Sequence, residues 1–228
     1  MANQELKNLI ARLKIAGVLK TPAIIGAFLK IDRKDFLPEN LKNLAYLDEA
    51  LAIGEGQTIS QPYTVAFMLE LLEPKAGDKI MDIGAGSGWQ TAILAEIVAA
   101  GGKTLGVSTS TPSVKEPAAG KVYAIERLPE LCAFGKDNVS KYNFIESGIV
   151  EWFCQDASSG LLQFMPFDKI IVAAEVDKIP ESWKKQLKVG GKIVAPIKNS
   201  IWLFIKNSEA GWKTKEYPGF VFVPFIKN

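Results

Sequence analysis

Histidine is absent from this chain of 228 residues, and its absence narrows the chemistry that the chain can perform. Histidine is the most frequent general base in catalysis and the commonest metal ligand. The two cysteines, Cys132 and Cys154, stand far apart and form no ligand pattern. We therefore expect no metal site built by the protein, and we predict two free thiols, as is usual in a cytoplasmic protein.

Strong net charge and long apolar runs are also missing. The formal net charge is +2, which gives no broad attraction to nucleic acid or to a membrane surface. No apolar run reaches the roughly 18 residues that a membrane-spanning helix needs, and the polar start MANQELKNLI does not resemble a signal peptide. We expect a cytoplasmic monomer without nucleic-acid or membrane partners. Its 48% hydrophobic content is enough for a sizeable core.

Strand-like and helix-like segments alternate from residue 79 onward, which favours a parallel, doubly wound sheet. Only Lys198 and Asn199 separate the fifth and sixth strands, so those two should form an antiparallel hairpin. The predicted fold is α/β and Rossmann-like, with a mostly parallel seven-stranded sheet and an antiparallel edge. We expect strands at 79–83, 121–126, 150–155, 168–174, 191–197, 200–207 and 220–226, and helices at 89–100, 128–142 and 180–187.

Residues 1–60 are predicted to form an N-terminal helical lobe with an irregular segment that covers the substrate and cofactor sites. Apolar residues recur at helical spacing within 6–20, and a second helix should follow Thr21-Pro22. Residues 61–228 would form the main domain, beginning with a helix over 61–72. Within it, the Gly-, Ser-, Thr- and Pro-rich stretch 101–120 is predicted to be a mobile surface insertion without chemistry.

The stretch MDIGAGSGWQ follows an expected strand and opens an expected helix. Gly84, Gly86 and Gly88 allow a tight turn and a close approach of the backbone to a ligand, and the helix N-terminus favours polar or anionic groups. The spacing differs from the dinucleotide pattern G-x-G-x-x-G, and no triphosphate-binding P-loop occurs. The loop therefore favours a nucleoside-type ligand, with a bare turn as the alternative.

Two acidic residues end the next two strands. Glu126 stands where doubly wound folds place an acid that accepts hydrogen bonds from ribose hydroxyls, and a solvated carboxylate is the alternative. Asp156 is placed to accept a hydrogen bond from an adenine amino group, and a loop-capping role is equally compatible with its position. Ligands of open α/β sheets bind at this edge, so the two acids and the glycine loop together predict a ligand site.

With these motifs, the sequence resembles the class I S-adenosylmethionine-dependent methyltransferases and, more narrowly, the protein-L-isoaspartate O-methyltransferase family. The resemblance covers nearly the whole chain, and GQTISQP is its most specific part. It rests on AGVLKTPAIIGAFLKIDRKDFLP, IGEGQTISQP, MDIGAGSGWQTAILA, KVYAIERLPEL, FDKIIVAA, IPESWKKQLKVGGKIVAPI and FVFVPFI.

The resemblance implies methylation of the free α-carboxylate of L-isoaspartyl residues in damaged proteins and peptides. The ester then cyclises to a succinimide, which can reopen to normal aspartate. The cofactor would be S-adenosyl-L-methionine, with S-adenosyl-L-homocysteine as product. Implied catalytic and substrate-binding residues are Ser60 with Thr58, Ile59, Gln61, Tyr63 and Val223, and Val223-Pro224 would help to line the peptide groove. Implied cofactor-binding residues are Asp82, Gly84, Ala85, Gly86, Ser87, Gly88, Gln90, Glu126, Arg127, Asp156 and Ala157.

Ser60 has two interpretations. It can be the N-cap of the helix over 61–72, or its hydroxyl can orient the substrate carboxylate, and the resemblance favours the second. A carboxylate with a pKa near ~4 is already ionised at neutral pH, so its methylation needs no general base. The absence of histidine therefore agrees with an acid acceptor.

Two other hypotheses remain at this point. The chain can be a related methyltransferase that acts on a normal Asp of a dedicated peptide or on another acid. It can also be a cofactor-binding protein without catalysis, although the intact glycine loop and the intact Thr58-Ile59-Ser60 segment argue against that.

Overall fold

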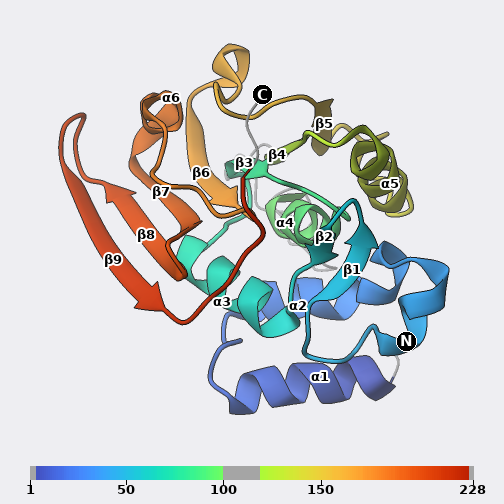
Figure 1. The fold of residues 1–228 in the computed structure, drawn as a ribbon. Helices are drawn as coiled ribbons and strands as arrows, with labels where there is room; N and C mark the ends of the chain where they lie inside the picture. The colour runs from blue at the N-terminus through green and yellow to red at the C-terminus, as the bar shows by residue number, and fades with distance from the viewer. Residues whose placement is uncertain (1–3, 100–118, 226–228) are drawn as a thin grey trace, which may run out of the picture.

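A computed structural model describes residues 4–99 and 119–225 of the chain. Its central sheet has seven strands in the order β5-β4-β3-β6-β7-β8-β9, and the neighbours from β5 to β7 run parallel (Figure 1). The predicted Rossmann-like sheet with an antiparallel edge is confirmed. The strands are β3 (Lys79–Ile83), β4 (Lys121–Glu126), β5 (Val150–Cys154), β6 (Phe167–Val172), β7 (Leu187–Ile197), β8 (Ser200–Lys206) and β9 (Trp212–Pro218).

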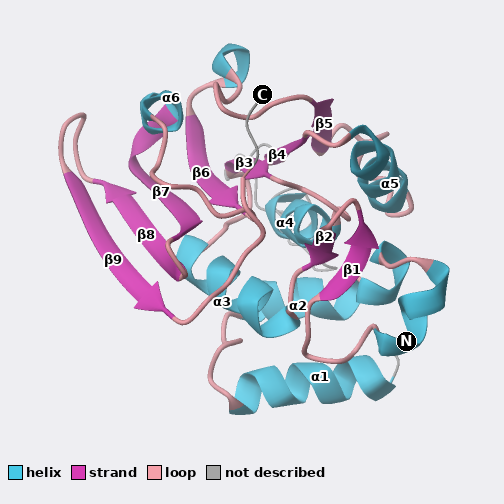
Figure 2. Ribbon diagram, in the orientation of Figure 1, coloured by secondary structure: helices cyan, strands magenta, loops and turns pink. Residues whose placement is uncertain are grey.

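Helices cover both faces of the sheet because its strands bury side chains on both sides (Figure 2). Ile80 and Val122 belong to one apolar cluster, while their chain neighbours Met81 and Tyr123 belong to a second one on the other face. The first cluster includes residues of α3, α4 and α5, and the second includes Trp183 of α6. The helices are α1 (Gln4–Ile15), α2 (Pro22–Lys30), α3 (Pro62–Leu72), α4 (Trp89–Ala99), α5 (Pro129–Ser140) and α6 (Glu181–Gln186).

Residues 4–60 pack against the main domain and share its first apolar cluster. The helix expected over 6–20 ends earlier, at Ile15, because Gly17 adopts a left-handed conformation with φ +69°. The irregular segment contains two short 3-10 helices, at Arg33–Phe36 and Glu39–Leu44. It also contains an antiparallel hairpin of β1 (Leu51–Gly54) and β2 (Gln57–Ile59), which the sequence analysis did not predict. The domain division at residue 60 stays a prediction.

The predicted strand at 220–226 is wrong. The seventh strand is β9, which pairs with β8 through a turn in which the Asn207 N–H donates to the Gly211 carbonyl at 2.8 Å. The apolar tail after β9 instead crosses the carboxyl ends of the strands (Figure 1). There Phe220 stacks on Phe67 and Phe225 meets Trp183 edge to face. These contacts cover Phe220 and Phe225 only in part, Val221 stays 83% exposed, and the segment 220–225 is not a strand.

The expectation of free thiols is also wrong. Cys132 of α5 and Cys154 at the end of β5 form a disulfide, with 5.7 Å between their Cα atoms. The two meet because β4 pairs Glu126 with Cys154, and α5 begins a few residues after Glu126. The cysteines therefore no longer support the expected cytoplasmic location, which had been inferred partly from free thiols. The predicted insertion at 101–120 lies, except for its last two residues, outside the described part of the chain.

Candidate functional site

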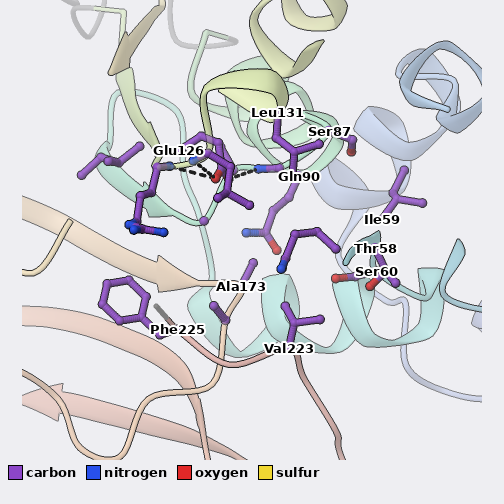
Figure 3. A pocket seen from close by; sticks show the side chains of 18 of the residues that line it. Thr58, Ile59, Ser60, Ser87, Gln90, Glu126, Leu131, Ala173, Val223 and Phe225 are labelled. Atoms are coloured by element: carbon purple, nitrogen blue, oxygen red, sulfur yellow. Dashed lines mark hydrogen bonds between the residues drawn. The ribbon is translucent and has the colours of Figure 1, made fainter. Parts of the chain in front are cut away.

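A cavity opens over the carboxyl ends of β3, β4 and β6, where ligands of doubly wound sheets bind. Its empty space is about 880 Å³ when the open mouth is included. Figure 3 shows Thr58 and Ser60 at the right of the cavity, Glu126 and Leu131 at its top, and Val223 and Phe225 below. The predicted site residues that line it are Thr58, Ile59, Ser60, Gly84, Ala85, Gly86, Ser87, Gln90, Glu126, Arg127, Ala157 and Val223.

The glycine loop connects β3 to α4 and turns at residues with positive φ. Gly84 and Gly86 have φ values of +77° and +53° and line the cavity. Gly88 has φ +84° but does not line it. A Cβ on Gly88 would come within 2.6 Å of Val139 Cγ2 and 2.8 Å of the Gly135 carbonyl oxygen. This third glycine therefore allows α5 to pack closely against the loop.

Glu126 is buried, so its interpretation as a solvated carboxylate is wrong. Its Oε2 accepts the Gly86 N–H at 2.8 Å, and its Oε1 accepts the N–H groups of Arg127 and Leu128 at 2.8 and 2.9 Å. A carboxylate can accept about four hydrogen bonds, so these three leave capacity for one more donor. The side chain lines the cavity and can still bind a hydroxyl there.

Asp82 is fully buried beneath the glycine loop and does not line the cavity. Its Oδ1 accepts Gln90 Nε2 at 2.9 Å, and its Oδ2 accepts the Thr91 hydroxyl at 2.6 Å. Burial raises the pKa of Asp82 to about 6, and the nearby Glu126 adds to the increase. Asp82 thus acts on the site through Gln90, whose side chain it holds at the cavity wall.

Asp156 caps its own loop, since its Oδ1 accepts the Ser158 N–H at 2.6 Å. Its neighbours Gln155 and Ala157 line the cavity, whereas Asp156 does not. The loop-capping interpretation is confirmed, and a contact of Asp156 with an adenine stays a prediction.

Ser60 lies where the first cavity meets a second one, and it lines both. The N-cap position of α3 belongs to Gln61, so Ser60 is not the helix cap. The helix start is instead satisfied by Asp48, whose Oδ1 accepts the Tyr63 N–H at 2.8 Å. The second cavity is lined by Asp48, Glu49, Ala50, Thr58, Ser60, Gln61, Thr64, Ala173, Gly219, Phe220, Val221, Phe222 and Val223.

Two of the predicted substrate residues differ in placement. Gln61 lines only the second cavity, whereas its neighbour Ser60 lines both cavities. Tyr63 lines neither cavity and stacks on Phe67 at 6.4 Å between ring centroids. Its side chain packs along α3, and its contact with substrate stays a prediction.

The C-terminal tail forms the remaining wall. The Glu175 N–H donates to the Val223 carbonyl at 2.8 Å, and the Phe225 N–H donates to the Glu175 carbonyl at 2.7 Å. These bonds fix Val223 where the two cavities adjoin. Several apolar residues of the first cavity were not predicted from the sequence, because an apolar side chain in a strand or helix pattern indicates only core. They are Val65, Trp89, Ile125, Leu128, Leu131 and Phe225.

The family model described as Protein-L-isoaspartate(D-aspartate) O-methyltransferase matches residues 3–228. This chain belongs to that family. Among curated relatives, a protein-L-isoaspartate O-methyltransferase of Methanopyrus kandleri is 36% identical over 224 residues. The match covers 96% of this chain and 90% of the relative's chain. One of Staphylothermus marinus is 37% identical over 226 residues, 97% and 94% of the two chains.

Solved structures of the family share the fold. A Plasmodium falciparum protein-L-isoaspartate O-methyltransferase in complex with S-adenosyl-L-homocysteine gives a TM-score of 0.82 at 23% identity, covering 97% of this chain and 98% of its own. A second structure, named protein-L-isoaspartate O-methyltransferase, gives 0.79 at 27% identity and covers 96% and 65% of the two chains. In the described residues, no helix is long and apolar enough to cross a membrane.

Proposed function

We infer that this chain is a methyltransferase that transfers the methyl group of S-adenosyl-L-methionine to the free α-carboxylate of L-isoaspartyl residues in proteins and peptides. Family membership over residues 3–228 supports this activity. The structural observation that carries it is the meeting of two cavities at Ser60: one lies over the strand ends and the other opens outward. A cofactor and a peptide can therefore approach each other at that residue.

The residues of the first cavity fit a nucleoside cofactor. Glu126 keeps acceptor capacity for a ribose hydroxyl, and Gly84 and Gly86 expose main chain at the cavity wall. Leu131 and Ile125 provide apolar surface for a flat base, beside Gln155 and Ala157. Gly84 to Ser87 and Gln90 would hold the methionine part. The assignment of single residues to parts of the cofactor is a proposal.

When bound, S-adenosyl-L-methionine supplies an electrophilic methyl group on a sulfonium. The chain itself needs no general base, because the acceptor carboxylate is already ionised at neutral pH. Ser60 would donate a hydrogen bond to that carboxylate and orient it in line with the methyl group. Ser60 is half-buried between the two cavities, so its hydroxyl lies where the two reactants would meet. Alignment of two reactants can supply roughly 7–11 kcal/mol in favourable cases.

The decisive experiment compares two peptides that differ in one linkage. Purified protein is incubated with labelled S-adenosyl-L-methionine and either an isoaspartyl peptide or its normal-Asp twin. We expect label in the isoaspartyl peptide alone. Label in the normal peptide alone would favour a related carboxylate methyltransferase. Binding of S-adenosyl-L-homocysteine in calorimetry without any transfer would favour a cofactor-binding protein.

Three finer points stay predictions. The monomeric state can be measured by light scattering of the purified protein. A cytoplasmic location and the absence of nucleic-acid partners can be examined by cell fractionation and by nuclease-treated pull-down.

A further inference from the structure

Arg33 is fully buried directly behind Ser60. It donates four hydrogen bonds, all to main-chain carbonyl groups. Its Nη1 donates to Ala45 at 2.9 Å and to Leu47 at 3.2 Å. Its Nη2 donates to Glu49 at 2.8 Å and to Ser60 at 3.1 Å. One side chain therefore connects the segment 45–49 to the residue at the junction of the two cavities.

This connection requires an arginine. The segment 45–49 has no strand ladder that would satisfy its carbonyl groups, and its residues Asp48 and Glu49 line the second cavity. The guanidinium is a rigid planar fork with five donors, whereas a lysine ammonium offers three donors from a single point. Burial lowers the pKa of Arg33 to about 10, and the nearby Asp48 counteracts this, so the side chain stays charged at neutral pH.

The same guanidinium also touches the cofactor side of the site. Its central carbon lies 5.3 Å from the centroid of the Trp89 ring. Trp89 is the first residue of α4 and lines the first cavity. Arg33 thus lies between a wall of the first cavity and the segment that forms a wall of the second.

We propose that Arg33 is a positioning residue for methyl transfer. It fixes the carbonyl of Ser60, and with it the main chain that sets the direction of the Ser60 hydroxyl. Ser60 needs this support because it lies between the last residue of β2, Ile59, and the N-cap of α3, Gln61. This proposal rests on the proposed function. A small displacement of an orienting group is enough to lower a transfer rate by up to ~100-fold.

The test uses Arg33→Lys, with Arg12→Lys as the matched control. Arg12 donates to the Tyr46 carbonyl at 3.0 Å, so it supports the same segment from α1 without reaching Ser60. We expect Arg33→Lys to lower kcat/KM for an isoaspartyl peptide about 10-fold or more, mainly through kcat. Its Kd for S-adenosyl-L-homocysteine should change less than about 3-fold. Arg12→Lys should leave both quantities near the wild-type values.

A double-variant cycle with Ser60→Ala separates positioning from general support. If Arg33 acts through the Ser60 hydroxyl, Arg33→Lys should have little further effect on kcat in the Ser60→Ala background. All assays are run at a temperature at which melting curves show every variant folded.

Several outcomes would overturn the proposal. The first is a kcat/KM for Arg33→Lys that is no lower than that for Arg12→Lys. The second is that the effects of Arg33→Lys and Ser60→Ala on kcat multiply fully in the double variant. The third is that Arg33→Lys loses affinity for S-adenosyl-L-homocysteine in parallel with kcat. Failure of Arg33→Lys to fold would also overturn the proposal, because the guanidinium would then be needed for the fold and not only for the position of Ser60. Failure of the wild-type protein to methylate the isoaspartyl peptide would instead reject the proposed function itself.

Discussion

The Gly86 N–H donates a 2.8 Å hydrogen bond to Glu126 Oε2, so the glycine loop after β3 is tied to the acid that ends β4. The two residues are forty positions apart and meet because β3 and β4 are parallel neighbours. The carboxylate therefore has two tasks: it shapes the loop, and it lines the cavity to which the loop belongs.

Glu126→Gln should weaken cofactor binding by about 10-fold or more, which corresponds to about 1.4 kcal/mol. The amide has a single acceptor oxygen, so its NH₂ group would face either the Gly86 N–H or the N–H groups of Arg127 and Leu128. Calorimetric titration with S-adenosyl-L-homocysteine measures the change. The exposed Glu130→Gln on α5 is the control and should bind as the wild type does. Equal affinity of the two variants would count against the role of Glu126.

Ser60→Ala should lower kcat far more than it changes cofactor affinity. We expect a loss of roughly 10- to 100-fold in kcat, because a donor that orients the reacting carboxylate is removed. Steady-state assays with an isoaspartyl peptide measure kcat, and calorimetry measures the Kd for S-adenosyl-L-homocysteine. Ser147→Ala, outside both cavities, is the matched control. An equal fall in cofactor affinity would make Ser60 a cofactor contact instead.

Asp82 should make stability depend on pH in a direction opposite to that of a salt-bridged acid. Its pKa is raised from 3.8 to about 6, so the folded state binds the proton more tightly than the unfolded state. Its contribution to stability is therefore fully present below about pH 4 and is lost as the pH rises through about 6. The difference corresponds to about 3 kcal/mol.

Asp82→Asn removes this titration, and the Thr91 hydroxyl, which donates to Asp82 Oδ2, can turn to accept from the new amide. The free energy of unfolding of the variant, relative to the wild type, should increase between pH 4 and pH 6.5 in urea titrations. Parallel curves for the two proteins would contradict the raised pKa.

Asp48 should stabilise α3 from outside the helix. Because Asp48 Oδ1 accepts the Tyr63 N–H, Asp48→Ala should cost about 1 kcal/mol, as the loss of a helix cap does. Asp48→Asn keeps an acceptor oxygen and should cost less. Urea denaturation of both variants measures the free energy of unfolding. Identical stability of Asp48→Ala and the wild type would exclude the capping role.

Reduction of the Cys132–Cys154 disulfide should lower the melting temperature. The cysteines are 22 positions apart, and closing a loop of that length stabilises a fold by about 3 kcal/mol in the chain-entropy model. For a chain of this size the shift is roughly 6–12 °C. Calorimetry with and without a phosphine reductant measures it, and a Cys132→Ser/Cys154→Ser variant should not respond to the reductant. Two titratable thiols in the denatured, unreduced protein would contradict the pairing.

Local patterns predicted the regular elements well where few residues set the geometry. Lys198 and Asn199 adopt φ values of +50° and +58°, as a two-residue hairpin turn requires, and the antiparallel pairing of β7 with β8 follows. The hairpin at 51–59 had a comparable signal that was missed. Glu55 and Gly56, with φ +52° and +68°, separate its two short strands.

A continuous apolar run failed as a guide to a strand at the C-terminus. FVFVPF is apolar throughout, yet the polar segment Trp212–Pro218 is the strand. An apolar run indicates side chains that favour burial, and contacts such as that of Phe220 with Phe67 cover part of this one without a ladder. Pairing with β8 depended instead on the turn at 207–211.

The succession of strands and helices between residues 79 and 206, and hence the edge at which Gly84 and Glu126 meet, was determined by the sequence alone. Parallel strands joined by helices place their carboxyl ends together, whatever else the chain does. The links of Arg33 to Ser60, of Asp48 to Tyr63 and of Cys132 to Cys154 were decided only by the tertiary structure. Each of them joins separate elements, so its geometry depends on how those elements pack and not on a local pattern.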